Sequence, residues 1–310
     1  MSDNWNYSQI NSNLFLITLD QKIEGFREFI SSWLYHHESI TFLVDPGPKS
    51  SIERLKKVLE IIGVNKLDYI LLTHVHIDHA GGTGKLLKYF PEAKVSCHPK
   101  GVKHLINPAE LWKSSLKVLG KIAEAYEEFI PVPEHNIFFQ EVIKKEEHVI
   151  EAIETPGHAP HHISYLFNQY LFAGEVAGVQ QTLPNRIYLR PATPPKFKLE
   201  TSLSSLEKVI AKNPKVICYG HYGINKEASK FLLLSQKQLT LWTEVIKEAL
   251  AKGEENLEKI VFERLLKEDK LFSNFHYLKE DIKKRERYFI NNSIKGIKEY
   301  LKEKLVKASG

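Results

Sequence analysis

The chain has 310 residues, of which 43% are hydrophobic and 26% charged, as in an ordinary folded protein with a sizeable core. Its net charge of +5 comes largely from the lysine-rich C-terminal part and argues only weakly for a polyanionic partner such as nucleic acid. No apolar run is as long as a membrane span, and residues 1–5 lack the pattern of a signal peptide. We therefore expect a cytoplasmic protein without membrane attachment. Cys97 and Cys218 stand in strand-like runs and are expected to be buried core residues.

The first third of the chain alternates strands with helices. Apolar runs predict the strands, and an apolar stripe with helical spacing that ends at Gly63 predicts the first helix. The predicted elements are strands at 14–18, 31–35 and 40–44, a helix at 52–62, a strand at 67–72, a short helix at 85–89 and a strand at 94–98. This order is typical of one half of a layered α/β fold.

Residues 99–130 interrupt this alternation. A short helical turn at 101–106 and a longer helix at 108–129 are predicted here. We interpret them as an insertion over one side of the functional site, with plain packing against the core as the alternative.

Strands return in the second half of the chain. The predicted elements are strands at 137–142 and 148–153, a hairpin of 163–167 with 170–173, a proline-rich loop at 190–195, a helix at 199–211 and a strand at 216–219. Only helices follow residue 224. They are predicted at 226–251, 254–266 and 277–305, the last broken near Asn291 and Asn292.

Residues 71–83 read LLTHVHIDHAGGT and place four potential metal ligands within six positions, directly after the predicted strand at 67–72. The four are His74, His76, Asp78 and His79. Imidazole and carboxylate groups together are typical ligands of zinc, iron and manganese. Gly81 and its small neighbours let the backbone turn tightly after them. This density predicts a metal site rather than histidines that only pack.

Three further strand ends carry a potential metal ligand. A histidine follows the strand at 148–153, an acid follows the strand at 170–173, and a histidine follows the strand at 216–219. These residues are His158, Glu175 and His221. Because loops at the ends of strands are held by a rigid sheet, we expect these three residues to converge with the first four.

Together these motifs resemble those of the metallo-β-lactamase superfamily, in the branch that includes glyoxalase II. They are T-H-x-H-x-D-H-x-G-G, T-P-G-H-x-P-x-H, a strand end of the form F-x-G-acid, and a final G-H, within residues 13–223. The resemblance implies an α/β fold, a four-layer αββα sandwich with a two-metal site at one edge. We predict this domain at 1–225, with the helical insertion at about 99–130, and an all-helical C-terminal extension at 226–310.

The resemblance also implies a ligand set and two divalent metal ions, zinc in the first place, with iron or manganese as alternatives. Carried over residue by residue, the ligands are His74, His76 and His158 for the first ion and Asp78, His79 and His221 for the second. Glu175 stands where the family usually has an aspartate that bridges the two ions.

Glu175 departs from the family pattern because glutamate is longer than aspartate by one methylene group. Its carboxylate can bridge two ions only if the strand end recedes or the side chain folds back, and the small residues Gly174 and Gly178 offer little bulk to force this. We therefore expect weak occupancy of the second metal position. Asp45 is a candidate acceptor for the free N–H of a ligating histidine, with turn capping as the alternative. His162 is expected to form hydrogen bonds or to pack rather than to bind metal.

The residues favour hydrolysis by a metal-bound hydroxide, with Asp78 accepting or orienting the proton of the water. The resemblance favours small-molecule esters, thioesters and lactones as substrates. Three alternatives stay open: a non-haem iron oxygenase of the persulfide-dioxygenase kind, a nuclease, and a ligand sensor that keeps metal with little turnover. The C-terminal helices lack the alternation of aromatic residues with arginine that would suggest a nuclease. We expect the first of them to pack on the core or to form a homodimer contact.

Overall fold

The computed structural model describes residues 6–253 and 255–308. Residues 1–5, on which the expectation of no signal peptide depends, lie outside the described residues. So does Glu254, where the second C-terminal helix was predicted to begin. None of the helices within the described ranges is long and apolar enough to span a membrane.

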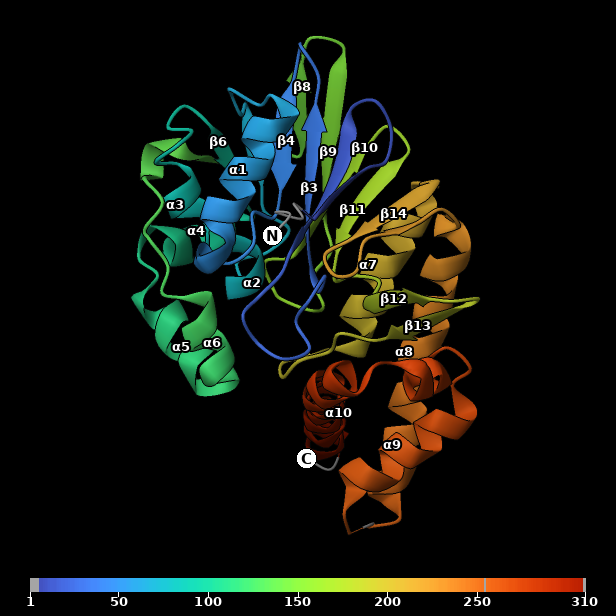
Figure 1. The fold of residues 1–310 in the computed structure, drawn as a ribbon. Helices are drawn as coiled ribbons and strands as arrows, with labels where there is room; N and C mark the ends of the chain where they lie inside the picture. The colour runs from blue at the N-terminus through green and yellow to red at the C-terminus, as the bar shows by residue number, and fades with distance from the viewer. Residues whose placement is uncertain (1–5, 254, 309–310) are drawn as a thin grey trace.

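Two mixed β-sheets form the centre of the molecule (Figure 1). The first contains, in spatial order, β1 (Tyr7–Gln9), β2 (Leu14–Leu19), β3 (Ile30–His36), β4 (Thr41–Val44), β5 (Tyr69–Leu71), β6 (Lys94–Ser96) and β7 (Ile137–Phe138). The second contains β15 (Ile224–Asn225), β14 (Val216–Tyr219), β11 (Tyr170–Gly174), β10 (Ile163–Phe167), β9 (His148–Glu154) and β8 (Val142–Lys145). The strands from β4 to β7 pair in parallel, and so do β11 and β14.

Helices cover the outer face of each sheet (Figure 1). On the first sheet these are α1 (Ile52–Ile62), α2 (Ile77–Ala80), α3 (Thr83–Leu86), α4 (Pro99–Ile106), α5 (Ala109–Leu119) and α6 (Lys121–Tyr126). Beside the second sheet lie α7 (Leu199–Ala211) and α8 (Ala228–Ala251), and α9 (Leu257–Glu268) and α10 (Glu280–Ala308) pack against α8. Short 3₁₀ turns are η1 (Lys49–Ser51), η2 (Glu134–Asn136) and η3 (Phe272–Tyr277).

Three layers of apolar side chains separate these four layers of structure. The middle one fills the space between the sheets and includes Trp33, Phe42 and Phe172. A second lies between the first sheet and α1 to α6, and a third between the second sheet and α7 to α10. Burial of three apolar layers is what holds such a fold together. The predicted four-layer αββα sandwich with a C-terminal helical extension is confirmed.

The C-terminal helices share the apolar layer of the second sheet. Trp242 of α8 contacts Phe272 edge-to-face, with ring centroids 5.0 Å apart. The buried carboxylate of Asp269 accepts hydrogen bonds from Trp242 Nε1 at 2.9 Å and from Gln238 Nε2 at 2.7 Å. These helices therefore pack on the core, and the division of the chain at residue 225 stays a prediction.

Two predicted elements are divided in the structure. The predicted helix at 108–129 breaks at Gly120, which has φ of +54° and separates α5 from α6. The predicted strand at 137–142 becomes β7 and β8, which belong to different sheets. Gln140 and Glu141 separate the apolar residues 137–139 from Val142, and the chain crosses from one sheet to the other there.

Two other regions differ from what was predicted, one by an element that was missed and one by a break that is absent. A hairpin of β12 (Val179–Leu183) and β13 (Arg186–Arg190) occupies a region in which no strand was predicted. Its first strand is rich in glutamine and threonine, so its apolar pattern is weak. The predicted break near Asn291 is absent, and α10 continues through it. The flanking Ile290 and Ile294 are fully buried, and this packing overrides the low helix propensity of asparagine.

Candidate metal centre

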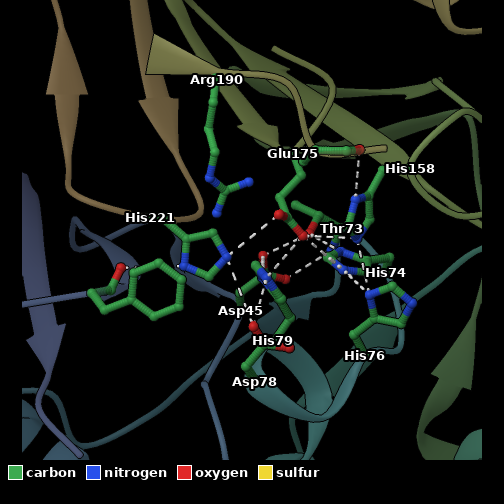
Figure 2. A network of polar contacts seen from close by, with 12 residues as sticks. Asp45, Thr73, His74, His76, Asp78, His79, His158, Glu175, Arg190 and His221 are labelled. Atoms are coloured by element: carbon green, nitrogen blue, oxygen red, sulfur yellow. Dashed lines mark hydrogen bonds and ion pairs between the residues drawn. The ribbon is translucent and has the colours of Figure 1, made fainter. Parts of the chain in front are cut away.

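All seven predicted ligand residues lie together at one edge of the two sheets (Figure 2). The loop after β5 carries the first two histidines, and the single turn of α2 carries the next pair. The loops that follow β9, β11 and β14 deliver the others. The potential ligand atoms form two groups, each within 4.8 Å: His74, His76, His158 and Glu175 in the first, and Asp78, His79 and His221 in the second.

In the first group three imidazole nitrogens face one another. His76 Nδ1 lies 2.9 Å from His74 Nε2 and 3.0 Å from His158 Nε2. Glu175 Oε2 lies 2.8 Å from His158 Nε2 and 3.5 Å from His74 Nε2. Lone pairs this close repel one another unless a proton or a cation lies among them, so the arrangement suits a cation.

The second group is more open, and Glu175 faces it as well. Asp78 Oδ2 lies 3.7 Å from both His79 Nε2 and His221 Nε2. Glu175 Oε1 lies 3.6 Å from His221 Nε2, and Glu175 Oε2 lies 3.7 Å from His79 Nε2. Figure 2 shows the Glu175 carboxylate between the two groups.

The backbone before Glu175 explains how the longer side chain fits. The pairing of β11 with β14 shifts register between Phe172 and Gly174, which is a bulge that redirects the strand end. Gly174 has φ of +54°, and a Cβ there would lie 2.4 Å from His162 Nε2. The strand end is therefore displaced, which is the condition under which a glutamate could bridge, and the Glu175 carboxylate faces both groups. The number of ions bound stays a prediction.

Four of the histidine rings are each oriented by an acceptor on the side that faces away from the centre. One ring nitrogen contacts that acceptor and the other faces the centre, as is typical of histidines that bind metals. The contacts are His79 Nδ1 with Asp45 Oδ2 (2.9 Å), His158 Nδ1 with the Ala192 carbonyl (3.1 Å), His221 Nδ1 with the Phe29 carbonyl (3.2 Å) and His74 Nδ1 with Thr73 Oγ1 (3.1 Å).

Asp45 is the acceptor that organises the motif side. Its carboxylate is buried and accepts hydrogen bonds from Thr73 N at 2.8 Å and Thr73 Oγ1 at 2.6 Å, besides its contact with His79. Its φ of +51° is unusual for a residue other than glycine. Asp45 thus lies where a partner for the Nδ1–H of His79 was expected, and the role of His79 as a metal ligand stays a prediction.

Burial and charge set the protonation of these residues. Burial, with the neighbouring imidazoles, holds the pKa of His74 and His76 well below the usual value, so both rings are neutral and keep a lone pair for a metal. Burial opposes protonation of His79, but the charges of Asp78 and Asp45 outweigh it and raise its pKa to about 9. Burial would raise the pKa of Glu175, but the surrounding histidines outweigh it and hold that pKa well below the usual value.

One buried atom tests whether a cation fits here. His79 Nε2 has no hydrogen-bond partner among the described residues, although the ring is completely buried. An unpaired buried nitrogen costs free energy, and it faces the oxygens of Asp78 and Glu175. A divalent cation among these three groups would satisfy all of them. The residues present therefore fit the metal that their chemistry implies.

A shell of residues behind His221 was not predicted from the sequence. The ring of Phe29 stacks on His221 with centroids 4.1 Å apart and an interplanar angle of 11°. The guanidinium of Arg285 in α10 also lies over the Phe29 ring, at 4.1 Å from its centroid. Glu286 binds Arg190 Nε at 2.5 Å and Arg285 Nη2 at 2.9 Å. These residues are far apart in the sequence, so no local signal could have identified them.

The remaining residues near the centre have structural contacts. His162 Nε2 accepts a hydrogen bond from Glu175 N at 3.0 Å, and His162 Nδ1 lies 2.8 Å from Thr155 Oγ1, so His162 forms hydrogen bonds as predicted. Cys97 and Cys218 are buried and free, as expected. No role was predicted from the sequence for Tyr126 of α6. Its buried hydroxyl has no partner within the described part of the chain.

Comparison with known proteins identifies the class to which this fold and site belong. Residues 25–221 match the family model described as "Metallo-beta-lactamase superfamily". The chain therefore belongs to the metallo-β-lactamase superfamily, as its motifs indicated.

Several relatives are similar over most of their length. A metallo-beta-lactamase fold-containing protein of Sulfurisphaera tokodaii is 32% identical over 210 residues, 64% of this chain and 75% of that protein. A hydroxyacylglutathione hydrolase of Buchnera aphidicola is 28% identical over 253 residues, 77% of this chain and 81% of that enzyme. The crystal structure of an archaeal superfamily member from Sulfolobus tokodaii has a TM-score of 0.68 at 24% identity, covering 93% of this chain and 98% of that one. At this identity the structural likeness shows the shared fold.

Proposed function

We propose that this protein is a metal-dependent hydrolase that cleaves an ester, thioester or lactone bond of a small molecule. The observation that carries the proposal is the pair of ligand groups that share one carboxylate. Glu175 Oε2 faces the first group at 2.8 Å from His158, and Glu175 Oε1 faces the second at 3.6 Å from His221. A pair of divalent ions, zinc in the first place, fits this arrangement.

The chemistry of the bound ions is that of Lewis acids, which acidify water and polarise a carbonyl oxygen. The protein's own part is to hold each ring with its lone pair inward, through Asp45, Thr73 and two backbone carbonyls. The side chain of Asp78 is 18% exposed, whereas those of His79, His221 and Glu175 are at most 9% exposed. Its carboxylate is thus placed to hold the proton of an attacking water while its neighbours stay enclosed.

Relatives support the substrate class. The hydroxyacylglutathione hydrolases among them act, by their name, on an acyl derivative of glutathione, which is a small-molecule acyl substrate. We extend only the acyl class to this chain, because these enzymes are at most 30% identical to it.

The C-terminal helices contribute to the surroundings of the ligands. A recess lined by His158 and Glu175 is also lined by Ser235, Gln238 and Leu239 of α8. On the other side of the centre, Arg285 of α10 supports the Phe29 ring behind His221. We infer that the extension forms a wall of the substrate pocket.

Metal analysis combined with a substrate panel tests the proposal. The protein is purified without added metal, its metal content is measured, and it is assayed on esters, thioesters and lactones before and after treatment with a chelator. We expect about two equivalents of zinc or manganese, and hydrolysis that the chelator abolishes and added metal restores. Undiminished hydrolysis by the stripped protein would refute the proposal. About one equivalent of iron with oxygen consumption on a persulfide would instead indicate an oxygenase.

A further inference from the structure

A second group of potential metal ligands lies at the opposite end of the sandwich. The turn at 37–40 joins β3 to β4 in the first sheet, and the turn at 146–147 joins β8 to β9 in the second. β3 begins at Ile30, which forms a bridge with His221, and it ends just before His37. One strand length, roughly 20 Å, therefore separates this group from the metal centre.

The two turns bring two imidazoles and a carboxylate together around one hydroxyl. Ser39 Oγ lies 2.7 Å from His37 Nδ1 and 2.7 Å from His148 Nε2. Glu147 Oε1 lies 3.2 Å from His148 Nε2. The potential ligand atoms of His37, Glu147 and His148 all lie within 4.8 Å of one another.

These side chains are held in place before any ligand binds. The His148 ring lies against Tyr35 at 6.0 Å and against Phe167 at 5.7 Å between centroids, and its side chain is only 12% exposed. The turn that carries His37 is closed by its backbone N–H, which donates to the Ile40 carbonyl at 3.0 Å. A site whose groups are already oriented binds with less loss of conformational entropy.

The donor set suits a transition-metal ion. Without an ion, the Ser39 hydroxyl donates to one ring nitrogen and accepts from the other, and Ser39 N donates to His37 Nδ1 at 3.3 Å. A cation would instead accept lone pairs from both rings, from the carboxylate and from Ser39 Oγ. Two histidines and a glutamate are a frequent set of protein ligands for zinc. The Glu147 side chain is 65% exposed, so an ion can enter directly from solvent.

We propose that His37, His148 and Glu147 bind one divalent transition-metal ion, zinc in the first place, and that this ion links the two sheets. The site is distinct from the metal centre and does not depend on the proposed hydrolase function. Because the unfolded chain does not hold these ligands together, binding stabilises the folded state in proportion to ion concentration.

Titration of zinc into the full-length protein tests this site. The metal centre is first saturated, and the uptake of further zinc is measured by calorimetry and by competition with a chromogenic chelator. Native protein is compared with H37A and E147Q, and with H135A as a control, because His135 is an exposed histidine outside both groups. Unfolding temperature with and without zinc is a second measurement.

We expect the native protein and H135A to bind one further zinc and to gain thermal stability from it. H37A and E147Q should bind this zinc at least about tenfold more weakly and lose the gain. The exposed position of Glu147 lets E147Q fold, and this variant keeps the proposal testable if H37A does not. The same uptake and the same thermal gain in all four proteins would overturn the proposal.

Discussion

The two halves of the sandwich contribute to the metal centre in different ways. The first half supplies four ligand positions within six residues, and one buried acid, Asp45, orients that segment through Thr73 and His79. The second half supplies one ligand from each of three strand ends. Two of its rings are oriented by backbone carbonyls, and the His221 ring is also covered by Phe29, whose own ring contacts Arg285 of α10.

This difference separates the local from the long-range determinants of the site. Substitutions in the first half should lower metal affinity and catalytic rate, because the buried hydrogen bonds of Asp45 hold the ligand segment itself. Changes in the second half should act first on stability, because its support is a buried ionic network that joins β13 to α10. The following predictions test that distinction, from the largest expected effect to the smallest.

Replacing Asp78 by alanine should lower kcat by roughly 10²–10⁴-fold while the fold stays intact. The change removes a ligand of the second group and the carboxylate placed to hold the proton of the water. Steady-state kinetics on a good substrate, with circular dichroism for the fold, would measure it. Glu92, an exposed acid of the same half, offers E92Q as a control. An unchanged kcat in D78A would show that the attacking water does not depend on this carboxylate.

Replacing Glu286 by glutamine should lower the free energy of unfolding by about 3–5 kcal/mol, because it leaves the buried Arg190 and Arg285 without a counter-charge. Burial alone would raise the pKa of Glu286, but the two arginines outweigh it and lower it to about 2. Because the pKa of Glu286 is lower in the folded than in the unfolded chain, the ionised carboxylate stabilises the fold fully at pH values above the unfolded pKa, near 4.5. This contribution is lost as the pH falls toward 2.

Urea unfolding of E286Q at several pH values would check both statements. Between pH 4.5 and 2, the free energy of unfolding of E286Q should fall less than that of the native protein, because the variant has no carboxylate at this position to protonate. E280Q is a suitable control, because the Glu280 side chain is 82% exposed and its ion pair lies on the surface. Equal unfolding midpoints for native protein and E286Q would mean that the second half does not rely on this network.

Replacing Asp45 by asparagine should weaken metal binding by about 10–100-fold. Asparagine tolerates the φ of +51°, so backbone strain does not confound the result. If its amide oxygen keeps the hydrogen bond from Thr73 N, its amide nitrogen faces Thr73 Oγ1 and His79 Nδ1 and can accept from neither. Chelator competition would measure the change, with D68N at the other end of the first sheet as the control. Unaltered affinity would show that the His79 ring is oriented by its packing alone.

The sequence predicted the first half of the centre nearly completely because its determinants are local. The motif, the preceding strand and the turn at Asp45 are contiguous patterns, and each has the structure expected of it. The second half was predicted only as single ligand positions. The bulge before Gly174, the hairpin that carries Arg190 and the contact of Arg285 with Phe29 depend on pairing between distant segments, which periodicity does not encode.

Two tyrosines, one in each half, allow a comparison at smaller scale. The hydroxyls of Tyr126 and Tyr219 are both buried without a partner among the described residues. Replacing either by phenylalanine should raise the free energy of unfolding by about 1 kcal/mol, because the unsatisfied hydroxyl is removed. Y188F should lower it instead, since Tyr188 donates to Glu286 Oε2 at 2.8 Å. Denaturant unfolding of the three variants gives the signs directly. A loss of stability in Y126F or Y219F would reveal a hydrogen bond to bound water.

Glu175 belongs to the second half but faces both ligand groups, so it tests whether the two groups act as one centre. Metal titration into stripped protein should show two tight equivalents for the native sequence, because its two oxygens lie 2.8 Å from His158 and 3.6 Å from His221. Glu175→Asp should keep both equivalents with at most about a tenfold loss for the second. The shorter acid is the family's usual ligand, and the bulge in β11 leaves the strand end free to adjust. If the substitution instead raised the occupancy of the second position, the native glutamate would reach only one ion, and the two ligand groups would bind their metals separately.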